Sequence, residues 1–351
     1  MQLHPLHARF EDTAWRMRIL KLCFFNNSLG RVSRADRNQF TVLCDGEEYS
    51  AKLRGIFFDG DRERPVVGDW VYVTIIPEGD SMIEAIRPRK SILKRADQSG
   101  HAIGYVKTMQ EQVMVANFDY VFILTSLNED YSLNRIARYV SVTLEGGGIP
   151  VVILAKADLC PDVTPFLKET AALSDKVRVH AISTQAGLGL EALRPYFREG
   201  VTIALLGSSG VGKSTLVNRL LGRDIMKTSA IREKDGKGRH TTTARQLFVQ
   251  DGVTLIDTPG MRELGLVDVD TGVSGTFEDI EALTAQCRFR DCTHGKEPGC
   301  AVRKALDDGT LDPKRWALYQ DMLGESRKNA DRKAIAIQRK KINQSGNRRN
   351  W

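Results

Sequence analysis

The segment GSSGVGKST at residues 207–215 combines three closely spaced glycines with a lysine and hydroxyl side chains. It follows an apolar run and precedes a helical pattern, which is the setting that a phosphate-binding loop requires. Glycines let backbone N–H groups curl around phosphates, and the N-terminus of the helix adds a favourable field. Lys213 is expected to reach the outer phosphates and Ser214 to ligate magnesium. The predicted phosphate-binding residues are Gly207, Ser208, Ser209, Gly210, Val211, Gly212, Lys213, Ser214 and Thr215.

A second phosphate-side motif, DTPG at 257–260, follows the apolar segment VTLI. We expect Asp257 to hold magnesium through water and Gly260 to present its N–H to the γ-phosphate. The charged stretch before this motif ends in GRHTTT at 238–243, which is expected to be the first switch. Thr242 is the first choice for the threonine that closes on magnesium, and Thr241 is the second. A threonine-rich start of a strand is the alternative.

The choice of base depends on AKAD at 155–158 and on the SxxxGxG pattern that begins at Ser183. The carboxylate of Asp158 can accept two hydrogen bonds from the N1 and N2 edge of guanine, which adenine cannot supply. Lys156 is expected to lie along the base plane, and the backbone around Ser183 and Thr184 is expected to meet the guanine O6. Ala155 stands where Asn or Thr is common, which predicts weaker nucleotide affinity with unchanged base choice. Guanine is the favoured base.

Hydrolysis of a triphosphate needs a group that orients the attacking water. Met261 stands at the position where many GTPases place a glutamine, and an apolar side chain cannot orient water. We therefore predict slow hydrolysis alone, with the missing group supplied by another residue or by a partner. His240 is the nearest candidate, and a surface histidine without a catalytic role is the alternative. The predicted catalytic set is His240, Lys213 and Thr242.

Cys287, Cys292, His294 and Cys300 form a C-x4-C-x-H-x5-C pattern. Without a recognisable secretory signal, such a cluster predicts a metal site and not disulfides. Three thiolates and one imidazole suit tetrahedral zinc, and because protein fills all four positions the site is predicted to be structural. Reduced surface thiols are the alternative. The metal would stabilise a small helical unit that cannot bury enough core by itself.

These motifs follow a run of alternating strand and helix patterns, which indicates a parallel sheet with helices on both faces. Its strands are expected at 121–126, 151–155, 177–183 and 201–207, and its helices near 134–144, 163–173 and 188–197. Ligands bind at the carboxyl ends of such strands, where the motifs lie. The base motifs precede the phosphate loop, although in an ordinary GTPase they come last. We therefore expect a circularly permuted P-loop GTPase domain of α/β class.

Short alternating strands lie before this domain, at 39–43, 49–55, 68–76 and 82–86. Their number and spacing predict a small antiparallel barrel, and about five strands fit an OB-fold. Such barrels commonly bind oligonucleotides, so contact with RNA and a purely structural role both stay open. The expected organisation is an N-terminal extension at 1–28, the barrel at 29–96, a linker at 97–112, the GTPase domain at 113–272, a helical zinc-binding domain at 273–326 and a basic tail at 327–351.

The composition and the distribution of charge indicate the class of protein and the kind of binding partner. The 351 residues, of which 42% are hydrophobic and 27% charged, predict a soluble chain of two or three domains. The longest apolar runs are far shorter than the roughly 20 residues of a membrane helix, so a cytoplasmic protein without membrane contact is expected. Of the net charge of +7, residues 327–351 carry nine Lys or Arg against Asp331. A basic arm on a near-neutral body predicts a polyanionic partner, with a merely solvated helix end as the alternative.

Three segments together, GRHTTT, DTPG followed by MRELGL, and CRFRDCTHGKEPGC, closely resemble the bacterial small ribosomal subunit biogenesis GTPases, the RsgA/YjeQ type. The resemblance covers about residues 29–325. It implies a cytoplasmic factor that acts late in small-subunit maturation near the decoding region, hydrolyses GTP when docked and then leaves. It also implies that the barrel and the zinc unit contact ribosomal RNA, and that His240 matches the histidine proposed to assist hydrolysis. Ala155 and the extension before Gly30 depart from the family pattern.

The predicted function is therefore that of a monomeric GTP hydrolase, slow alone and stimulated by the small ribosomal subunit, with Mg²⁺ at the nucleotide and one structural Zn²⁺. Guanine nucleotides and ribosomal RNA are the expected partners. One alternative is a zinc-containing P-loop kinase, against which DTPG, the threonine switch and Asp158 argue. The other is an RNA-binding chaperone with a regulatory nucleotide site, which a comparison of turnover with and without small subunits would separate.

Overall fold

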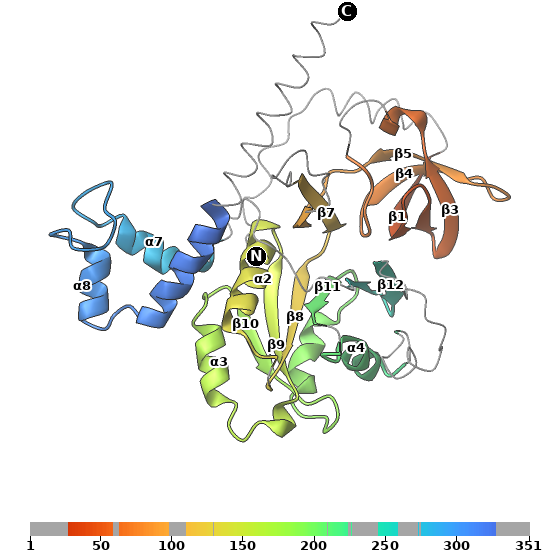
Figure 1. Ribbon diagram of the computed structural model, residues 1–351. Helices are drawn as coiled ribbons and strands as arrows, with labels where there is room; N and C mark the ends of the chain where they lie inside the picture. Colours follow the sequence, from red (N-terminus) through yellow and green to blue (C-terminus); the bar gives the residue numbers. More distant parts are fainter. Residues whose placement is uncertain are drawn as a thin grey trace, which may run out of the picture. The chain divides into compact units, whose positions relative to one another are not determined.

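The structure is a computed structural model that describes residues 27–58, 63–97, 110–128, 130–208, 210–223, 226, 245–258, 273 and 275–327 (Figure 1). Its contacts divide the chain into two compact units. One contains the described residues up to Pro65 together with Asp69–Pro88, and the other contains Val66–Gly68 and the described residues from Arg89 onward. None of the helices in these ranges is both long enough and apolar enough to cross a membrane.

The first unit is a closed five-stranded barrel. Its strands are β1 (Ser28–Ala35), β2 (Phe40–Cys44), β3 (Glu47–Leu53), β4 (Trp70–Thr74) and β5 (Ser81–Ile86). They pair in the order β1-β2-β3-β5-β4 and back to β1, antiparallel except for the parallel pair β3–β5. Buried and half-buried residues alternate along β2 and β4, so one side of each strand lines the barrel core. The expected OB-like barrel is confirmed.

The strand after the barrel belongs to the other unit. β6 (Ile92–Asp97) pairs antiparallel with β7 (Gln110–Ala116). The barrel was expected to extend to residue 96, whereas its last strand ends at Ile86. The physical reason is that β5 already pairs with both β3 and β4, so the closed barrel offers no edge to another strand. Residues 98–109, most of the expected linker, lie outside the described residues.

The second unit contains a six-stranded sheet. Its strands are β8 (Tyr120–Ser126), β9 (Ile149–Ala155), β10 (Arg178–Ala181), β11 (Thr202–Gly207), β12 (Gln246–Gln250) and β13 (Val253–Asp257). They lie in the order β10-β9-β8-β11-β13-β12, parallel except for the pair β12–β13. The strands that carry the base motifs precede β11 in the chain and lie together on one side of it. This is the arrangement that the rotated motif order predicts.

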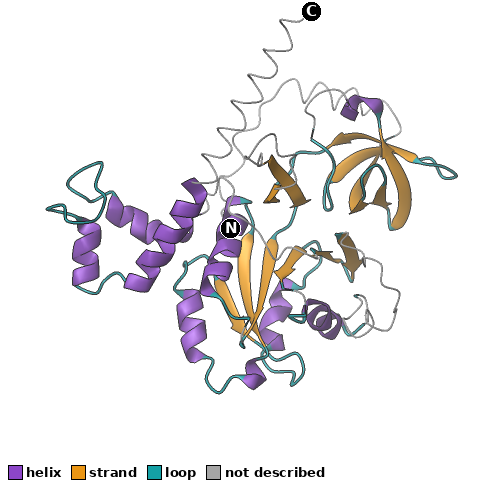
Figure 2. Cartoon of the chain, in the orientation of Figure 1, coloured by secondary structure: helices purple, strands orange, loops and turns teal. Residues whose placement is uncertain are grey.

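Helices cover both faces of this sheet (Figure 2). They are α2 (Leu133–Glu145), α3 (Thr164–Ala171), the 3-10 helix η3 (Leu190–Tyr196) and α4 (Lys213–Leu221). Phe122 and Leu124 of β8 share one apolar cluster with Val217 of α4. Val121 and Ile123 alternate with them and therefore face the other side, and α2 packs against β8 and β9. Burial on both faces explains why these strands are continuous apolar runs.

The C-terminal part of the described chain is helical. It comprises α7 (Glu278–Thr284), α8 (Ala301–Asp307) and helical residues 313–327. We call residues 275–327 the metal module. Arg315 joins it to the GTPase domain by donating to both carboxylate oxygens of Asp279 (3.0 and 2.7 Å) and to the carbonyl oxygens of Ala172 (2.6 Å) and Leu173 (3.1 Å) at the end of α3. One arginine therefore bridges the two parts.

Candidate nucleotide site and metal centre

The phosphate loop leaves the end of β11, whose six residues are all buried. At Gly207, φ is 148° and a Cβ would lie 2.6 Å from the carbonyl oxygen of Leu124 on the neighbouring strand, so only glycine fits. Gly210 and Gly212 are also left-handed, with φ of 78° and 102°, and Gly212 is the N-cap of α4. The described residues of the loop lead into the N-terminus of α4, where free N–H groups attract anions.

Lys213 is held against this loop. Its ammonium group donates to the carbonyl oxygen of Gly207 at 2.7 Å and to that of Ser208 at 2.9 Å. Both acceptors belong to the loop itself, so the positive charge stays where an incoming phosphate would lie. The loop therefore offers a fixed cation together with a helix N-terminus, an arrangement that binds phosphate.

The predicted magnesium residues belong to adjacent elements. β11 and β13 run parallel with Leu205 opposite Asp257, and the Thr258 hydroxyl donates to the carbonyl oxygen of Leu205. Asp257 is buried at the end of β13, and Ser214 lies in the first turn of α4. A carboxylate and a hydroxyl are hard oxygen donors, and magnesium prefers such ligands completed by water and phosphate. The donor set at this edge of the sheet fits a magnesium ion.

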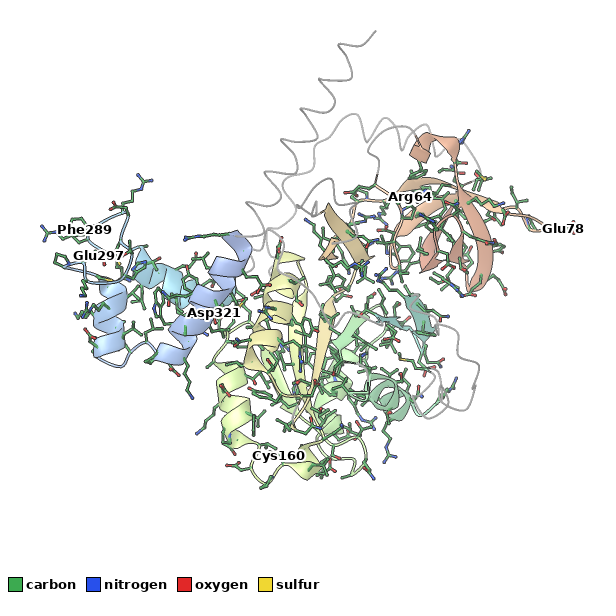
Figure 3. All side chains as sticks on the ribbon, in the orientation of Figure 1. Arg64, Glu78, Cys160, Phe289, Glu297 and Asp321 are labelled. Carbon is green, nitrogen blue, oxygen red and sulfur yellow. The ribbon has the colours of Figure 1, made fainter. Side chains whose placement is uncertain are left out.

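The base motif forms a tight turn at the end of β9. Lys156 has a left-handed backbone with φ of 59°, and the Ala157 N–H donates to the carbonyl oxygen of Ile182 at 2.9 Å. A short 3-10 turn, Ala157–Leu159, then presents the exposed side chain of Asp158. Cys160, labelled in Figure 3, closes this turn with its N–H on the Ala157 carbonyl. The turn is therefore fixed from both sides by backbone hydrogen bonds.

The second base loop is fixed by Ser183. The Ser183 hydroxyl accepts the N–H of Ala186 at 3.0 Å, and the Ser183 N–H donates to the carbonyl oxygen of Leu188 at 3.0 Å. Gly189 is left-handed, and a Cβ there would lie 2.4 Å from the carbonyl oxygen of Ala181. The second glycine of the SxxxGxG pattern, Gly189, is thus required by close backbone packing against Ala181 of β10.

The phosphate loop, the AKAD turn and the Ser183 loop line one cavity of about 920 Å³. Its lining residues are Ala155, Lys156, Asp158, Leu159, Ser183, Thr184, Gln185, Gly210, Val211, Gly212, Thr215, Asn218, Arg219, Gly222 and Arg223. The volume is within the range typical of sites for small molecules and cofactors. Segments that are far apart in the chain therefore meet at the carboxyl edge of the sheet.

Three polar residues of the cavity, Asn218, Arg219 and Arg223, lie outside the predicted motifs. Thr215, Asn218, Arg219 and Gly222 are spaced i, i+3, i+4 and i+7, so they share one face of α4 and its continuation. The Arg219 guanidinium lies beside the second base loop, since a Cβ on Gly187 would be 3.8 Å from its Nη2 atom. The signal in the sequence was this helical spacing, counted from the phosphate loop.

Some predicted site residues lie outside the described residues. They are Ser209, His240, Thr242 and Gly260, together with the second-choice Thr241 and with Met261. Their expected roles stay predictions.

The four predicted metal ligands lie together, with all their ligand atoms within 4.8 Å of one another. The sulfurs of Cys287 and Cys300 are 3.9 Å apart, and Nδ1 of His294 lies 3.5 and 3.6 Å from them. With zinc–sulfur bonds of about 2.3 Å and zinc–nitrogen bonds of about 2.0 Å, a tetrahedron has edges of about 3.8 and 3.5 Å. The three separations among Cys287, His294 and Cys300 match these edges, and the Cys292 sulfur lies within 4.8 Å of each of the other ligand atoms. The cluster therefore fits a four-coordinate metal held entirely by protein.

The loop that carries His294 is fixed by Glu297, which Figure 3 labels near Phe289. The Glu297 carboxylate accepts the N–H of Thr293 at 3.0 Å, the N–H of Gly295 at 2.8 Å and the Thr293 hydroxyl. The hydrogen bond from the Thr293 side chain, with the backbone donors, lowers the pKa of Glu297 to about 2. Glu297 thus accepts hydrogen bonds from both neighbours of His294. The backbone of His294 itself has a φ of 60°, which is strained for a residue with a side chain.

Helix α8 supports the metal ligands electrostatically. The Cys300 sulfur accepts the N–H of Arg303 at 3.4 Å as the N-cap of this helix. Burial raises the pKa of Cys287, but hydrogen bonds from the N–H groups of Ala301 and Val302 outweigh it, so the pKa falls below its ordinary value. A lowered pKa favours the Cys287 thiolate, which is the form that binds metals. Burial raises the pKa of Cys292 instead, to about 11.

Known proteins with similar sequences indicate the family of this chain. A family model described as RsgA GTPase matches residues 86–267. The small ribosomal subunit biogenesis GTPase RsgA 2 of Lactiplantibacillus plantarum is 43% identical over 301 residues, which cover 85% of this chain and 83% of that protein. The RsgA 2 protein of Vibrio vulnificus is 44% identical over 281 residues, covering 80% and 77% of the two chains.

Two solved structures are similar. The crystal structure of YjeQ from Thermotoga maritima has a TM-score of 0.63 and 27% identity, covering 85% of this chain and 98% of that one. YloQ, described as a circularly permuted GTPase, has a TM-score of 0.59 and 22% identity, with coverage of 88% and 96%. The second likeness shows the permuted fold alone. With a phosphate loop and base loops around one cavity, a matching family model and relatives above 40% identity, the chain belongs to the RsgA GTPase family.

Proposed function

We propose that this chain is a GTPase assembly factor for the small ribosomal subunit, which binds ribosomal RNA and hydrolyses GTP while docked on the subunit. Its relatives are named for small-subunit biogenesis, and it shares with them most of its length. The kinase and chaperone alternatives are not favoured by this family. We further propose that the protein acts as a monomer in the cytoplasm.

One observation supports this proposal above the others: the three guanine-nucleotide motifs line a single cavity. Asp158 is exposed there, so its carboxylate is available to the N1 and N2 edge of guanine. Lys156 and Arg219 add positive charge to the same cavity, which suits a ligand with several phosphates. Ala155 lines the cavity with a methyl group, so that position offers no side-chain hydrogen bond to the nucleotide.

In the proposed mechanism, hydrolysis transfers the γ-phosphoryl group of GTP to water. Lys213, fixed on the loop carbonyls, stabilises the charge that develops on the phosphate oxygens. His240 is proposed to position the attacking water, because the apolar side chain of Met261 cannot. Thr242 is proposed to close the switch on the magnesium. The reaction is proposed to be slow alone and faster on the subunit, where docking would order the switch.

Two metals complete the proposal. Magnesium, which would be held by Ser214, Asp257 and Thr242, supplies charge neutralisation at the phosphates when bound. Zinc, which would be held by Cys287, Cys292, His294 and Cys300, supplies cross-links that fix the metal module. The four zinc ligands would take no part in GTP hydrolysis, because all of them would be bound to the zinc.

The deciding experiment measures GTP hydrolysis by the chain alone, with small subunits and with large subunits. We expect strong stimulation by small subunits only. Equal turnover in all three mixtures would contradict the assembly role. Adding salt is expected to weaken the complex steeply because phosphate contacts release counterions. Deleting residues 327–351 should weaken it as well if the basic tail holds RNA.

The base assignment has its own test. Asp158→Asn replaces one acceptor oxygen by a donor, so it is expected to shift preference from guanine to xanthine nucleotides. The measurement is hydrolysis of both triphosphates at equal concentration, with Asp162→Asn as the matched control on a nearby exposed carboxylate. Retained preference for GTP in the Asp158 variant would show that another residue reads the base.

A further inference from the structure

The loop after β8 lies next to the phosphate loop. β8 and β11 are parallel neighbours, with Leu124 opposite Gly207, so their following loops emerge at the same edge of the sheet. Asn128 orders the loop after β8, because its side-chain oxygen accepts the Ser126 hydroxyl at 2.8 Å and the Asp130 N–H at 3.1 Å. Asp130 is therefore held in one position by its own loop.

The Asp130 carboxylate connects two elements. Its Oδ2 atom accepts the Ser208 hydroxyl at 2.7 Å, and its Oδ1 atom accepts Nη2 of Arg135, on α2, at 2.9 Å. Arg135 also donates to the Asp130 carbonyl oxygen. Ser208 is 4% exposed, and the side chains of Asp130 and Arg135 are 24% and 28% exposed. A charged hydrogen bond in such a sheltered place is stronger than one in water.

The contact continues to the lysine of the phosphate loop. Ser208 receives its side-chain partner from Asp130, and its carbonyl oxygen is one of the two acceptors that hold the Lys213 ammonium. Asp130 is thus linked to Lys213 through a single residue. Movement of Ser208 would shift an acceptor of Lys213 and, with it, the charge that meets the outer phosphates.

We propose that Asp130 is a positioning residue of the nucleotide site, which fixes Ser208 and through it the phosphate loop and Lys213. This inference rests on the proposed function, since it assigns a role in binding the phosphates of the guanine nucleotide. Asp130 does not touch the nucleotide in this role. It sets the shape of the loop that does.

Electrostatics explains why an acid is tolerated here. An isolated carboxylate beside a phosphate site would repel the nucleotide. Arg135 offsets that charge at 2.9 Å, and its second hydrogen bond, to the Asp130 carbonyl oxygen, fixes the pair. The neighbouring strand β9 ends in Ala155, whose methyl group cannot form a side-chain hydrogen bond to the loop. Among the described residues, Asp130 gives the phosphate loop a side-chain anchor from outside the loop and its helix.

The test compares Asp130→Ala, Ser208→Ala and the double variant in binding of fluorescent GDP and GMP. Each single variant is expected to weaken GDP binding about tenfold, in line with the loss of one charged hydrogen bond. The double variant should lose no more GDP affinity than the single variant with the larger loss, because both changes break the same contact. GMP affinity should fall less than GDP affinity, since GMP lacks the phosphates that Lys213 reaches. Asp130→Asn should keep more affinity than Asp130→Ala, because its amide oxygen still accepts.

Glu191→Ala is the matched control, because it removes an exposed carboxylate that pairs with Arg194 at 2.7 Å away from the cavity. It should leave both affinities unchanged. Additive losses in the double variant, or equal losses for GDP and GMP, would overturn the role of Asp130. Unaltered GDP binding in Asp130→Ala would overturn it as well. If the unaltered protein binds no guanine nucleotide, the proposed function itself fails, which is a different result from either of these.

Discussion

The nucleotide cavity takes its lining from three segments between Ala155 and Arg223, whereas the four metal ligands lie within fourteen residues of chain. The cavity depends on a buried sheet that brings distant loops to one edge. The metal module has short helices, such as the seven-residue α7 and α8, and its ligand loop is largely exposed. The sheet region is therefore fixed by apolar burial, whereas the metal module combines a small apolar core, which includes Phe277, Ile280 and Val302, with its ligand geometry. The two regions should therefore fail for different reasons.

The largest expected effect follows from breaking the metal centre. Cys287→Ser removes one of four ligands, and structural zinc contributes about 10–16 kcal/mol of apparent binding free energy in small modules. We expect the variant to lose its metal and the helicity of α7 and α8 while it keeps guanine nucleotide binding. Metal content, far-UV circular dichroism and GDP affinity measure the three outcomes. Cys160→Ser, at a cysteine outside the cluster, is the control for metal content and helicity, and it keeps the backbone N–H that closes the base turn.

A substitution in the apolar core of the GTPase domain should have the converse effect, with nucleotide binding lost before the metal. Phe122 is fully buried in β8 and packs edge-on against Tyr196, with ring centroids 5.4 Å apart. Phe122→Ala is expected to lower the free energy of unfolding of the GTPase domain by about 3–5 kcal/mol through the cavity it leaves. Denaturant unfolding followed by GDP release checks this, with Val249→Ala, at a residue of β12 that is 47% exposed, as the control. Loss of metal before loss of nucleotide would contradict the comparison.

An arginine that helps to join the two regions should come next in size of effect. Arg315 donates five hydrogen bonds, and its side chain is only 15% exposed. Arg315→Ala is expected to lower the stability of the metal module by about 2–4 kcal/mol, since its partners lose charged hydrogen bonds. Limited proteolysis between the two regions would be accelerated. Arg194→Ala, at a side chain 71% exposed, should have no such effect.

The smallest expected effect is on pH dependence. Burial raises the pKa of Asp279, but the hydrogen bonds and positive charge of Arg315 outweigh it and hold the pKa below its usual value of 3.8. A lowered carboxyl pKa contributes stability that is present above the ordinary pKa and is lost as pH falls through the folded-state pKa. Asp279→Asn should therefore destabilise the protein near neutral pH and make less difference below about pH 4. A constant difference across the titration would show that charge is not involved.

Much of the fold could be predicted from the sequence. Motif types and strand patterns predicted the barrel, the permuted sheet and the ligand cluster, because each depends on residues close together in the chain. The predicted helix near 188–197 is a 3-10 helix, since Pro195 lacks the N–H that a longer α-helix would need. The barrel's end was placed too late, because strand character alone does not show which sheet a strand joins.

By itself, the sequence determined which chemistry the chain carries: a phosphate loop, a base-reading carboxylate, and four metal ligands whose spacing leaves little choice of geometry. Only the tertiary structure decided which other side chains join them. Arg219, on α4, and Arg223, just after this helix, line the cavity, and Asp130 reaches Ser208 because β8 lies beside β11. The physical reason is that short-range patterns fix local conformation and ligand spacing, whereas contacts between side chains 78 residues apart, such as Asp130 and Ser208, depend on strand order in the sheet.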